Sequence, residues 1–209
     1  MIRRFEKING RYPELIRGQS RLAYSLSTSE DFYDMPAIIA NGGHQGTVIS
    51  FYDLADGKVF TPFEKKKNVI YGRPLYCNEK YCFLQGDFND GKIRLYSWIP
   101  GKEPKLLHVL DIENTDLYNL GLAGNELHIV AQNSERLISY WPESFSIPLD
   151  PHESLEFIDN ERIYLSSWVE EGWDETNGCA SFDYRYYEKT VVKDKRERLV
   201  CRDRFPLSG

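Results

Sequence analysis

The chain has 209 residues, of which 41% are hydrophobic and 14% aromatic, and it carries a formal net charge of −6 with a pI near 5.3. A chain of this kind can bury a substantial core, so we expect a single domain over residues 1–209. The acidic balance argues against nucleic acid or membrane as partners, and neither an 18-residue apolar run nor a secretory leader occurs. A cytoplasmic location is therefore expected.

Short β-branched and aromatic runs follow one another along the chain, and turn residues such as NGG, DG, NDG and PG separate them. No window of a dozen residues shows a period of 3.6, so the predicted fold class is all-β. The expected strands, in chain order, are 37–40, 48–52, 59–63, 80–84, 92–98, 105–109, 127–131, 136–141, 162–166 and 181–187.

Four of these strands carry a tyrosine at a constant spacing of 44 positions, at Tyr52, Tyr96, Tyr140 and Tyr184. Their neighbours repeat as well, at Ile49, Ile93 and Leu137, at Phe51 and Leu95, and at Gly57 and Gly101. Further upstream, Ile39, Phe83 and Leu127 have the same spacing, which predicts a strand before each tyrosine strand. One period before Tyr52, the corresponding residue is Ile8. A period of this size is typical of stacked or radially repeated β units.

The repeat favours a small β-propeller of four to five four-stranded blades, because a β-sandwich, the alternative, has no reason to reproduce the same residues every 44 positions. In period and hydrophobic pattern most of the chain resembles the WD40 and kelch β-propeller families. Ser97-Trp98, Tyr140-Trp141 and Ser167-Trp168 are similar to the Trp-Asp dipeptide that closes the third strand of WD40 blades, although each lacks the Asp. The resemblance carries over no functional residue.

If the tyrosine strand is the third of its blade, the preceding hairpins 42–46, 86–91, 131–135 and 166–177 join the second and third strands and lie on one face. The resemblance implies that this face binds ligands or partners. The rim would be polar and mostly acidic, with His44, Gln45, Asp87, Asn89, Asp90, Gln132, Asn133 and Glu135.

The fourth hairpin is much longer than its counterparts, and loops of such length are usually functional or disordered. Trp168 and Trp173 offer flat apolar faces, while Glu170, Glu171 and Asp174 can accept hydrogen bonds or attract a cation. Aromatic rings beside carboxylates suit sugars, choline-like cations or Arg-rich peptides. The structural alternative is that these Trp wedge between blades and the acids are merely solvated.

Metal and redox chemistry is not indicated. Cys77 and Cys82 are separated by four residues within a strand–turn–strand pattern, which lacks the paired CxxC clusters of zinc sites, so we expect them to be buried apolar residues; a disulfide between them is the alternative. Nucleophile-elbow, P-loop, HExxH and dinucleotide motifs are absent from the sequence. No metal and no cofactor are expected.

Two functions remain as hypotheses. The first is a non-catalytic binding module that presents its acidic and aromatic rim to a protein, peptide or small ligand. The alternative is a carbohydrate-active enzyme or lectin-like protein that uses carboxylates at the channel mouth, with Asp87, Asp90, Glu135 and Glu171 as candidates for general acid and base. The ligand-binding residues predicted under either hypothesis are Trp168, Glu170, Glu171, Trp173, Asp174, Asp87, Asp90 and His44.

Overall fold

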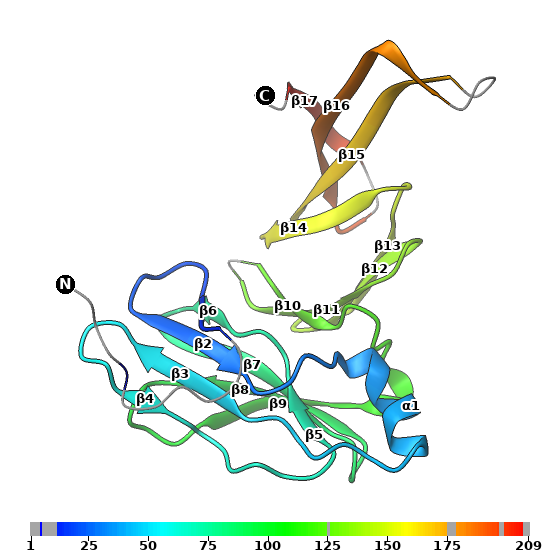
Figure 1. Ribbon diagram of the computed structural model, residues 1–209. Coiled ribbons are helices and arrows are strands. Elements are labelled where there is room, and N and C mark those ends of the chain that lie inside the picture. The colour runs from blue at the N-terminus through cyan, green and yellow to red at the C-terminus, as the bar shows by residue number, and fades with distance from the viewer. Residues whose placement is uncertain (1–4, 6–11, 125, 175–178, 197–198, 207–209) are drawn as a thin grey trace. The chain divides into compact units, whose positions relative to one another are not determined.

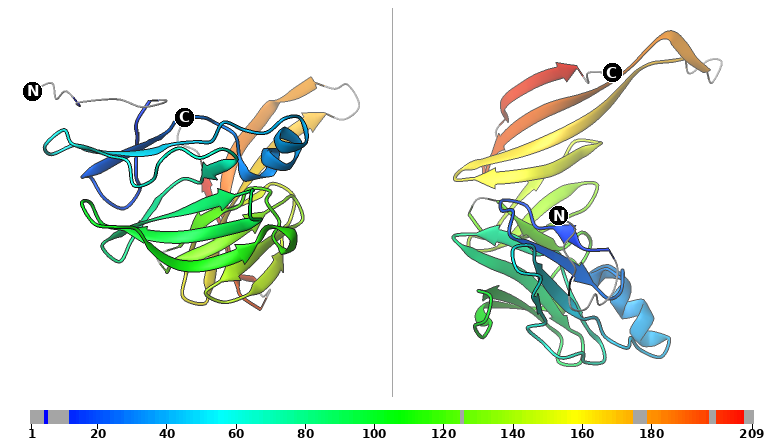
Figure 2. Two further views of the ribbon diagram at one scale, coloured as in Figure 1. Left: turned by 90° about the horizontal axis from the view of Figure 1, so that it is seen from below. Right: turned by 60° about the vertical axis from the view of Figure 1, so that its left-hand side comes forward.

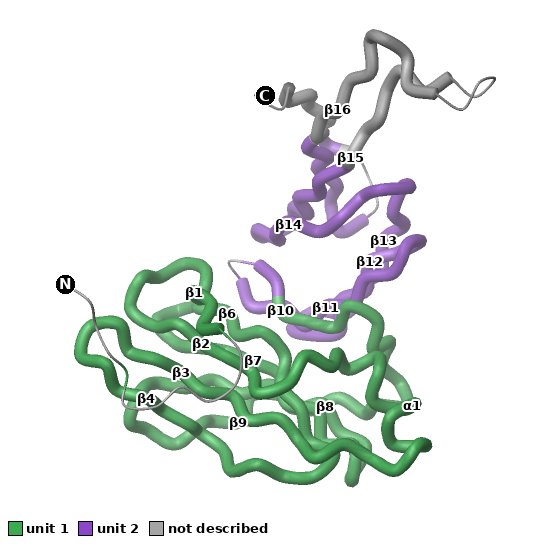
Figure 3. The backbone as a smooth tube through the Cα atoms, viewed as in Figure 1, with its two compact units in different colours: residues 1–122 green, residues 123–209 purple. Residues whose placement is uncertain are grey.

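The computed structural model describes residues 5, 12–124, 126–174, 179–196 and 199–206 (Figure 1). For the strand residues 168–174, 179–189, 199 and 201–206 it describes the backbone alone. The chain divides into two compact units, residues 1–122 and residues 123–209, which Figure 3 shows in separate colours.

Four antiparallel sheets follow one another along the chain, and we call them blades 1 to 4. The strands of the first two blades lie in the first unit. Blade 1 consists of β1 (Glu14–Leu15), β2 (Leu22–Leu26), β3 (Ile49–Asp53) and β4 (Val59–Phe60). Blade 2 consists of β5 (Val69–Tyr71), β7 (Lys80–Asp87), β8 (Lys92–Trp98) and β9 (Lys105–Asp111), with β6 (Leu75–Cys77) paired to β7.

The other two blades belong to the second unit, apart from the first residues of β10. Blade 3 consists of β10 (Gly121–Ala123), β11 (His128–Gln132), β12 (Arg136–Trp141) and β13 (Phe145–Pro148). Blade 4 consists of β14 (Glu153–Asp159), β15 (Arg162–Asp174), β16 (Cys179–Asp194) and β17 (Leu199–Pro206). Four consecutive antiparallel sheets, three of four strands and one with the short β6 as a fifth strand, are the sheet set of a four-bladed β-propeller, so the all-β class and the blade prediction are confirmed.

The tyrosine repeat marks the same strand in every blade. Tyr52, Tyr96, Tyr140 and Tyr184 lie in β3, β8, β12 and β16, the third strand of each sheet. Three positions earlier, Ile49, Ile93 and Leu137 are all fully buried. In blades 1 to 3 the repeat therefore marks a position that packs into a core; the earlier register at Ile8 lies outside the described residues.

The turn that leaves the third strand is conserved in conformation between blades 1 and 2. Gly57 has a φ of 80° in the β3–β4 turn, and Gly101 has a φ of 79° in the β8–β9 turn. Residues with a side chain rarely adopt such angles, so glycine recurs at both positions. The 44-residue spacing of these glycines follows from the shared backbone geometry.

Alternation along β7 and β8 divides one face of blade 2 into two halves. Tyr81 pairs with Trp98 and Phe83 with Tyr96, and the cluster of these rings with Phe51 of β3 forms the aromatic core of the first unit. Further along the same face the pairs become Gln85 with Arg94 and Asp87 with Lys92. Alternate residues of a strand point to the same side, so these four pairs share one face. Along the strands this face changes from aromatic to polar and charged.

One predicted strand is wrong. Residues 37–40 lie in the short helix α1 (Met35–Ala40), which follows the 3-10 turn η1 (Phe32–Asp34), and the second strand of blade 1 is β2. The match of Ile39 to Phe83 therefore joins a helix to a strand. The helix begins with Pro36 near its start, and the Asp31 N–H donates to Asp34 Oδ2 at 3.1 Å. The first predicted hairpin, 42–46, is thus only the end of a connection that spans residues 27–48.

The long fourth hairpin is a two-stranded ribbon rather than a loop. β15 and β16 remain paired from Arg162 opposite Asp194 to Asp174 opposite Cys179, as the long twisted ribbon in Figure 2 shows. Residues 175–178, which connect the two strands, lie outside the described part of the chain. Ser167-Trp168 consequently lies in a second strand, whereas Ser97-Trp98 and Tyr140-Trp141 end third strands as the resemblance implies.

Cys77 and Cys82 are buried free thiols in the β6–β7 pair, as predicted. Burial raises the pKa of Cys82 to about 12, which keeps this thiol protonated and unreactive at neutral pH. β17 pairs antiparallel with β16 and is the fourth strand of blade 4.

Candidate functional site

The connection between β2 and β3 positions an exposed aromatic beside two buried anchors. Phe32 and Met35 are buried, while the side chain of Tyr33 between them is 59% exposed. Phe32 can pack closely on blade 2 because Gly86 has no side chain: a Cβ there would lie 2.9 Å from the Phe32 ring. The anchors therefore fix η1 and α1 on the first unit and hold Tyr33 outward.

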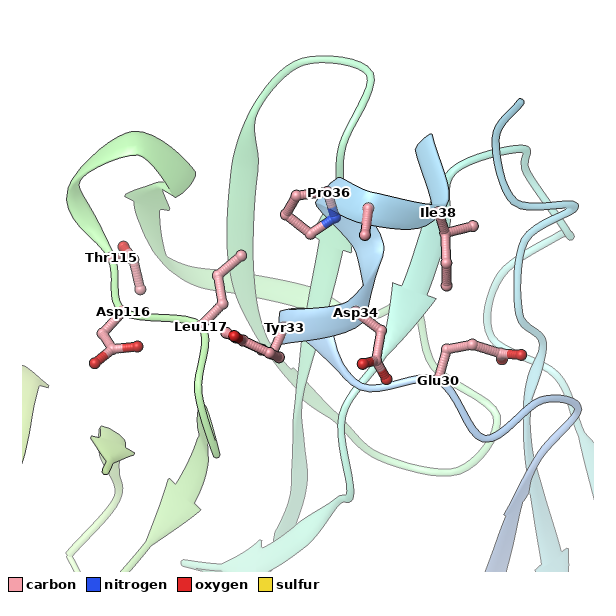
Figure 4. Close-up of a pocket in the computed structure, with 9 residues that line it drawn as sticks. Glu30, Tyr33, Asp34, Pro36, Ile38, Thr115, Asp116 and Leu117 are labelled. Atoms are coloured by element: carbon pink, nitrogen blue, oxygen red, sulfur yellow. The ribbon is translucent and has the colours of Figure 1, made fainter. Parts of the chain in front are cut away.

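A groove of about 810 Å³ lies between this segment and the residues that follow η2 (Ile112–Asn114); we call it the α1 groove. One wall comes from residues 30–38 and the other from residues 115–117, so both belong to the first unit. Figure 4 shows Asp116 and Glu30 on opposite sides of Tyr33. The lining residues are Glu30, Tyr33, Asp34, Pro36, Ala37, Ile38, Thr115, Asp116 and Leu117.

The α1 groove combines negative charge with apolar surface. Three of its nine lining residues are acidic and none is basic. A hydrogen bond from Thr28 lowers the pKa of Glu30, and the nearby His44 adds to this effect. Tyr33 also meets the exposed Tyr118 edge to face, with ring centroids 5.2 Å apart. The groove therefore presents carboxylates on both walls around aromatic and aliphatic side chains.

His44, a predicted site residue, lies behind Glu30 and not in the groove lining. Its Nε2 is 3.4 Å from Glu30 Oε2, and its Nδ1 accepts a hydrogen bond from the Gly46 N–H at 2.9 Å. Its backbone N–H donates to Asn68 Oδ1 at 2.8 Å, and its carbonyl accepts from the Asn68 N–H at 2.9 Å. These contacts brace the loop that leads into β3.

The first two predicted rim hairpins do come together within the first unit. Asn68 bridges them, because it contacts His44 on one side and donates from Nδ2 to Asn89 Oδ1 at 3.2 Å on the other. Asn89 also donates to the Lys67 carbonyl at 2.8 Å. Lys67 and Asn68, which precede β5, thus link the first predicted hairpin (42–46) to the second (86–91).

Asp87 and Asp90 line a second, smaller hollow of about 350 Å³ in the first unit, on the charged half of the blade 2 face. Asp87 lies 2.6 Å from Lys66 Nζ and 3.7 Å from an Arg94 nitrogen, and Asp90 also pairs with Arg94. Burial alone would raise the pKa of Asp87, but hydrogen bonds from Lys66 and Asn89 outweigh it and lower the pKa. Asp87 is therefore an ionised, paired carboxylate.

Aromatic rings form the other side of this hollow. Phe63 stacks on Tyr71 with centroids 5.7 Å apart and contacts Tyr96 at 5.0 Å. Gln85 Nε2 donates to the Tyr71 hydroxyl at 3.1 Å, and burial raises the pKa of Tyr71 to about 12. The hollow thus places neutral hydroxyls and rings beside charge pairs.

The third predicted hairpin has structural contacts in the second unit. Gln132 donates to the Glu153 carbonyl at 3.1 Å and accepts from the Leu155 N–H at 2.9 Å, which ties blade 3 to β14. Asn133 Oδ1 accepts from the backbone N–H groups of Glu135 and Arg136 at 3.0 Å and thereby forms the turn.

For the fourth hairpin the structure gives the backbone course only. The positions of Trp168, Glu170, Glu171, Trp173 and Asp174 lie in β15, and their side chains are outside the described part of the chain. Their role in ligand binding stays a prediction.

The groove residues Glu30, Tyr33, Asp34 and Asp116 were not predicted from the sequence. The available signal was the segment DFYDMP, in which Asp followed by a second Asp and Pro is typical of a helix start. A helix start inside an otherwise all-β chain indicates an inserted feature on a connection, and such connections often carry function.

The chain matches no family model, no curated protein and no solved structure. Among the described residues, no His, Cys, Asp and Glu side chains gather in a group of three or more that could hold a metal ion. Within the same part of the chain, no helix has the length and apolar character needed to cross a membrane.

Proposed function

We propose that this protein is a non-catalytic binding module that takes a protein or peptide partner in the α1 groove. The observation that carries the proposal is the exposed Tyr33, held outward by buried neighbours in an open groove that is partly lined by apolar side chains. Exposed aromatics on a rigid frame are typical anchors of interfaces. The groove volume of about 810 Å³ also lies within the range of ligand-binding clefts.

The state of the carboxyl groups supports binding rather than acid catalysis. Glycoside hydrolysis needs one carboxylic acid with a raised pKa as proton donor. Among the described residues, each carboxyl group with a clearly shifted pKa has it lowered, namely Glu30, Asp56, Asp87 and Glu143. These groups are ionised at neutral pH and suit the role of hydrogen-bond acceptors.

A selection from a random peptide display library tests the proposal. We expect the recovered peptides to lose at least tenfold in affinity for the Tyr33→Ser variant, because truncating an interface anchor costs about 2 kcal/mol or more. Tyr12→Ser is the matched control, since the side chain of Tyr12 is 92% exposed and lies outside the groove. Peptides that bind both variants as well as the unaltered protein would overturn the proposal.

A saccharide ligand in the Asp87 hollow is the second candidate, and it corresponds to the lectin-like alternative. The observation that favours it is the grouping of Asp87 and Asp90 with the rings of Phe63, Tyr71 and Tyr96 around one hollow. Carboxylates can accept hydrogen bonds from sugar hydroxyls, and aromatic faces can pack against the apolar faces of sugar rings. On a glycan array, binding that disappears in Tyr96→Ala and survives in Tyr33→Ser would support this candidate, and the absence of any bound glycan would contradict it.

A further inference from the structure

We infer that the partner segment of the α1 groove is cationic, with an apolar side chain flanked by arginine or lysine. This inference rests on the proposed function and adds the chemistry of the partner. Its basis is the position of the charges: Glu30 and Asp34 belong to one wall and Asp116 to the other, while apolar side chains lie among them (Figure 4).

Electrostatics favours a basic partner over a neutral or acidic one. The lining holds three carboxylates and no Lys, Arg or His. The Thr28 hydrogen bond that lowers the pKa of Glu30 keeps that carboxylate charged at neutral pH. A carboxylate-bearing segment would meet like charges on both walls, which opposes its binding. A segment with two cationic side chains can pair with carboxylates of both walls at once.

The aromatic groups favour arginine in particular. Tyr33 and Tyr118 are 59% and 45% exposed and meet at an interplanar angle of 86°. A planar guanidinium can stack on such a ring face and donate to a carboxylate at the same time, whereas the ammonium of lysine acts as a point charge. Arginine therefore uses both kinds of surface that the groove offers.

The apolar part of the groove lining favours an apolar residue between the two cations of the partner segment. Pro36, Ile38 and Leu117 contribute aliphatic surface, and Pro36 is exposed in the structure. Covering such surface favours binding because apolar area is removed from water. A leucine or similar side chain in the centre of the segment would make this contribution.

Fluorescence anisotropy with three labelled peptides tests the inference. The probes are Gly-Arg-Leu-Arg-Gly, Gly-Gln-Leu-Gln-Gly and Gly-Glu-Leu-Glu-Gly, each acetylated and amidated to remove terminal charges. We expect the arginine peptide to bind at least tenfold more tightly than the glutamine peptide, because charge-assisted hydrogen bonds are stronger than neutral ones. We expect the glutamate peptide to bind most weakly.

Charge-neutralising variants connect this preference to the groove. We expect Asp34→Asn and Asp116→Asn each to weaken the arginine peptide by about three- to tenfold and to leave the glutamine peptide within about twofold. Glu103→Gln, an exposed acid outside the groove, is the matched control and should change neither affinity. Circular dichroism and the thermal midpoint of each variant verify that it is folded.

The outcomes separate this inference from the proposed function. If the glutamine peptide binds as tightly as the arginine peptide, and loses affinity in Tyr33→Ser but not in Asp34→Asn, the cationic partner is wrong while the groove remains the binding site. Arginine-peptide binding that is unchanged in both Asp34→Asn and Asp116→Asn also overturns the inference. If no peptide of any charge responds to Tyr33→Ser, the proposed function and the inference fail together.

Discussion

The buried ion pair between Lys193 and Glu153 is held in position by further hydrogen bonds to the backbone. In the second unit, Lys193 Nζ lies 2.6 Å from Glu153 Oε2, with both side chains at least 91% buried. Lys193 also donates to the Pro148 carbonyl at 3.0 Å, and the same Glu153 oxygen accepts from the Asp150 N–H at 2.8 Å. A charge in such a place costs several kcal/mol if its partner is removed.

We therefore expect Glu153→Gln to lower the free energy of unfolding by about 3 kcal/mol, because Lys193 would remain charged and buried without a counterion. The matched control is Asp111→Asn, which removes the partner of Lys92 in a pair whose two side chains are both exposed, and it should change stability far less. Urea unfolding followed by circular dichroism measures both. Equal effects of the two substitutions would contradict the importance of burial.

A second residue-scale prediction concerns pH. His128 is fully buried, with Nδ1 3.2 Å from Ser139 Oγ and with no hydrogen-bond partner for Nε2 among the described residues. Burial lowers the pKa of His128, and the nearby Lys195 lowers it further. The unfolded chain thus takes up the proton first, so the stability that neutral His128 contributes is complete above about pH 6.5 and declines as the pH falls toward its folded pKa.

The free energy of unfolding should accordingly fall between pH 7.5 and pH 5.5, and this dependence should be shallower in His128→Leu. His152→Asn serves as the control, because His152 is exposed and has a positive φ of 68° that Asn tolerates. An unchanged pH slope in His128→Leu would contradict the prediction.

At the scale of elements, the connection that carries α1 depends on a close approach of backbones. Gly46 has a φ of 86°, and a Cβ at this position would lie 2.0 Å from the Lys66 carbonyl oxygen. Gly42 has a φ of 116° but would meet nothing within 4 Å. Both positions favour glycine by conformation, and only Gly46 is also closed to a side chain.

Gly46→Ala should therefore be more destabilising than Gly42→Ala, by about 1–3 kcal/mol, as expected when a well-packed backbone has to shift. Thermal unfolding of the two variants gives the comparison. Similar losses of stability would mean that the strain of the positive φ, and not the contact with Lys66, decides the effect.

Sequence patterns predicted some elements well and missed others for physical reasons. β8 and β12 agree residue for residue with the predicted 92–98 and 136–141, because their alternating side chains pack on a core. Helix α1 has only six residues, too few to show a helical period, and Pro36 in its first turn is the local signal for its start. The three-residue strands β5 and β10 are likewise too short for alternation to indicate them.

The candidate site was predicted less well than the fold for a related reason. The repeat identifies what the blades share, whereas Tyr33 and its groove lie on a connection of blade 1 that the other blades lack. Asp87 and Asp90, two of the predicted site residues, line one hollow, but their pairing with Lys66 and Arg94 is not part of the repeat pattern. Periodicity carries no information about such contacts.

At the scale of the whole molecule, the 44-residue repeat runs through both units without a break in composition, which is the basis for expecting one domain. Repeat architectures unfold cooperatively when neighbouring repeats stabilise one another. We expect a single transition in differential scanning calorimetry, with equal calorimetric and van't Hoff enthalpies. Two separate transitions would contradict the single-domain prediction and assign independent stability to residues 1–122 and 123–209.

The function proposed for this protein depends on whether a partner binds in the α1 groove. Titration of the ¹⁵N-labelled protein with the Arg-Leu-Arg peptide, followed by amide chemical shifts, tests it most directly. We expect saturable shifts concentrated in residues 30–38 and 115–117, which line the groove, and in the adjoining Tyr118, and we expect their loss in Tyr33→Ser. Saturable shifts confined to other parts of the chain, or no shifts at millimolar peptide, would contradict it.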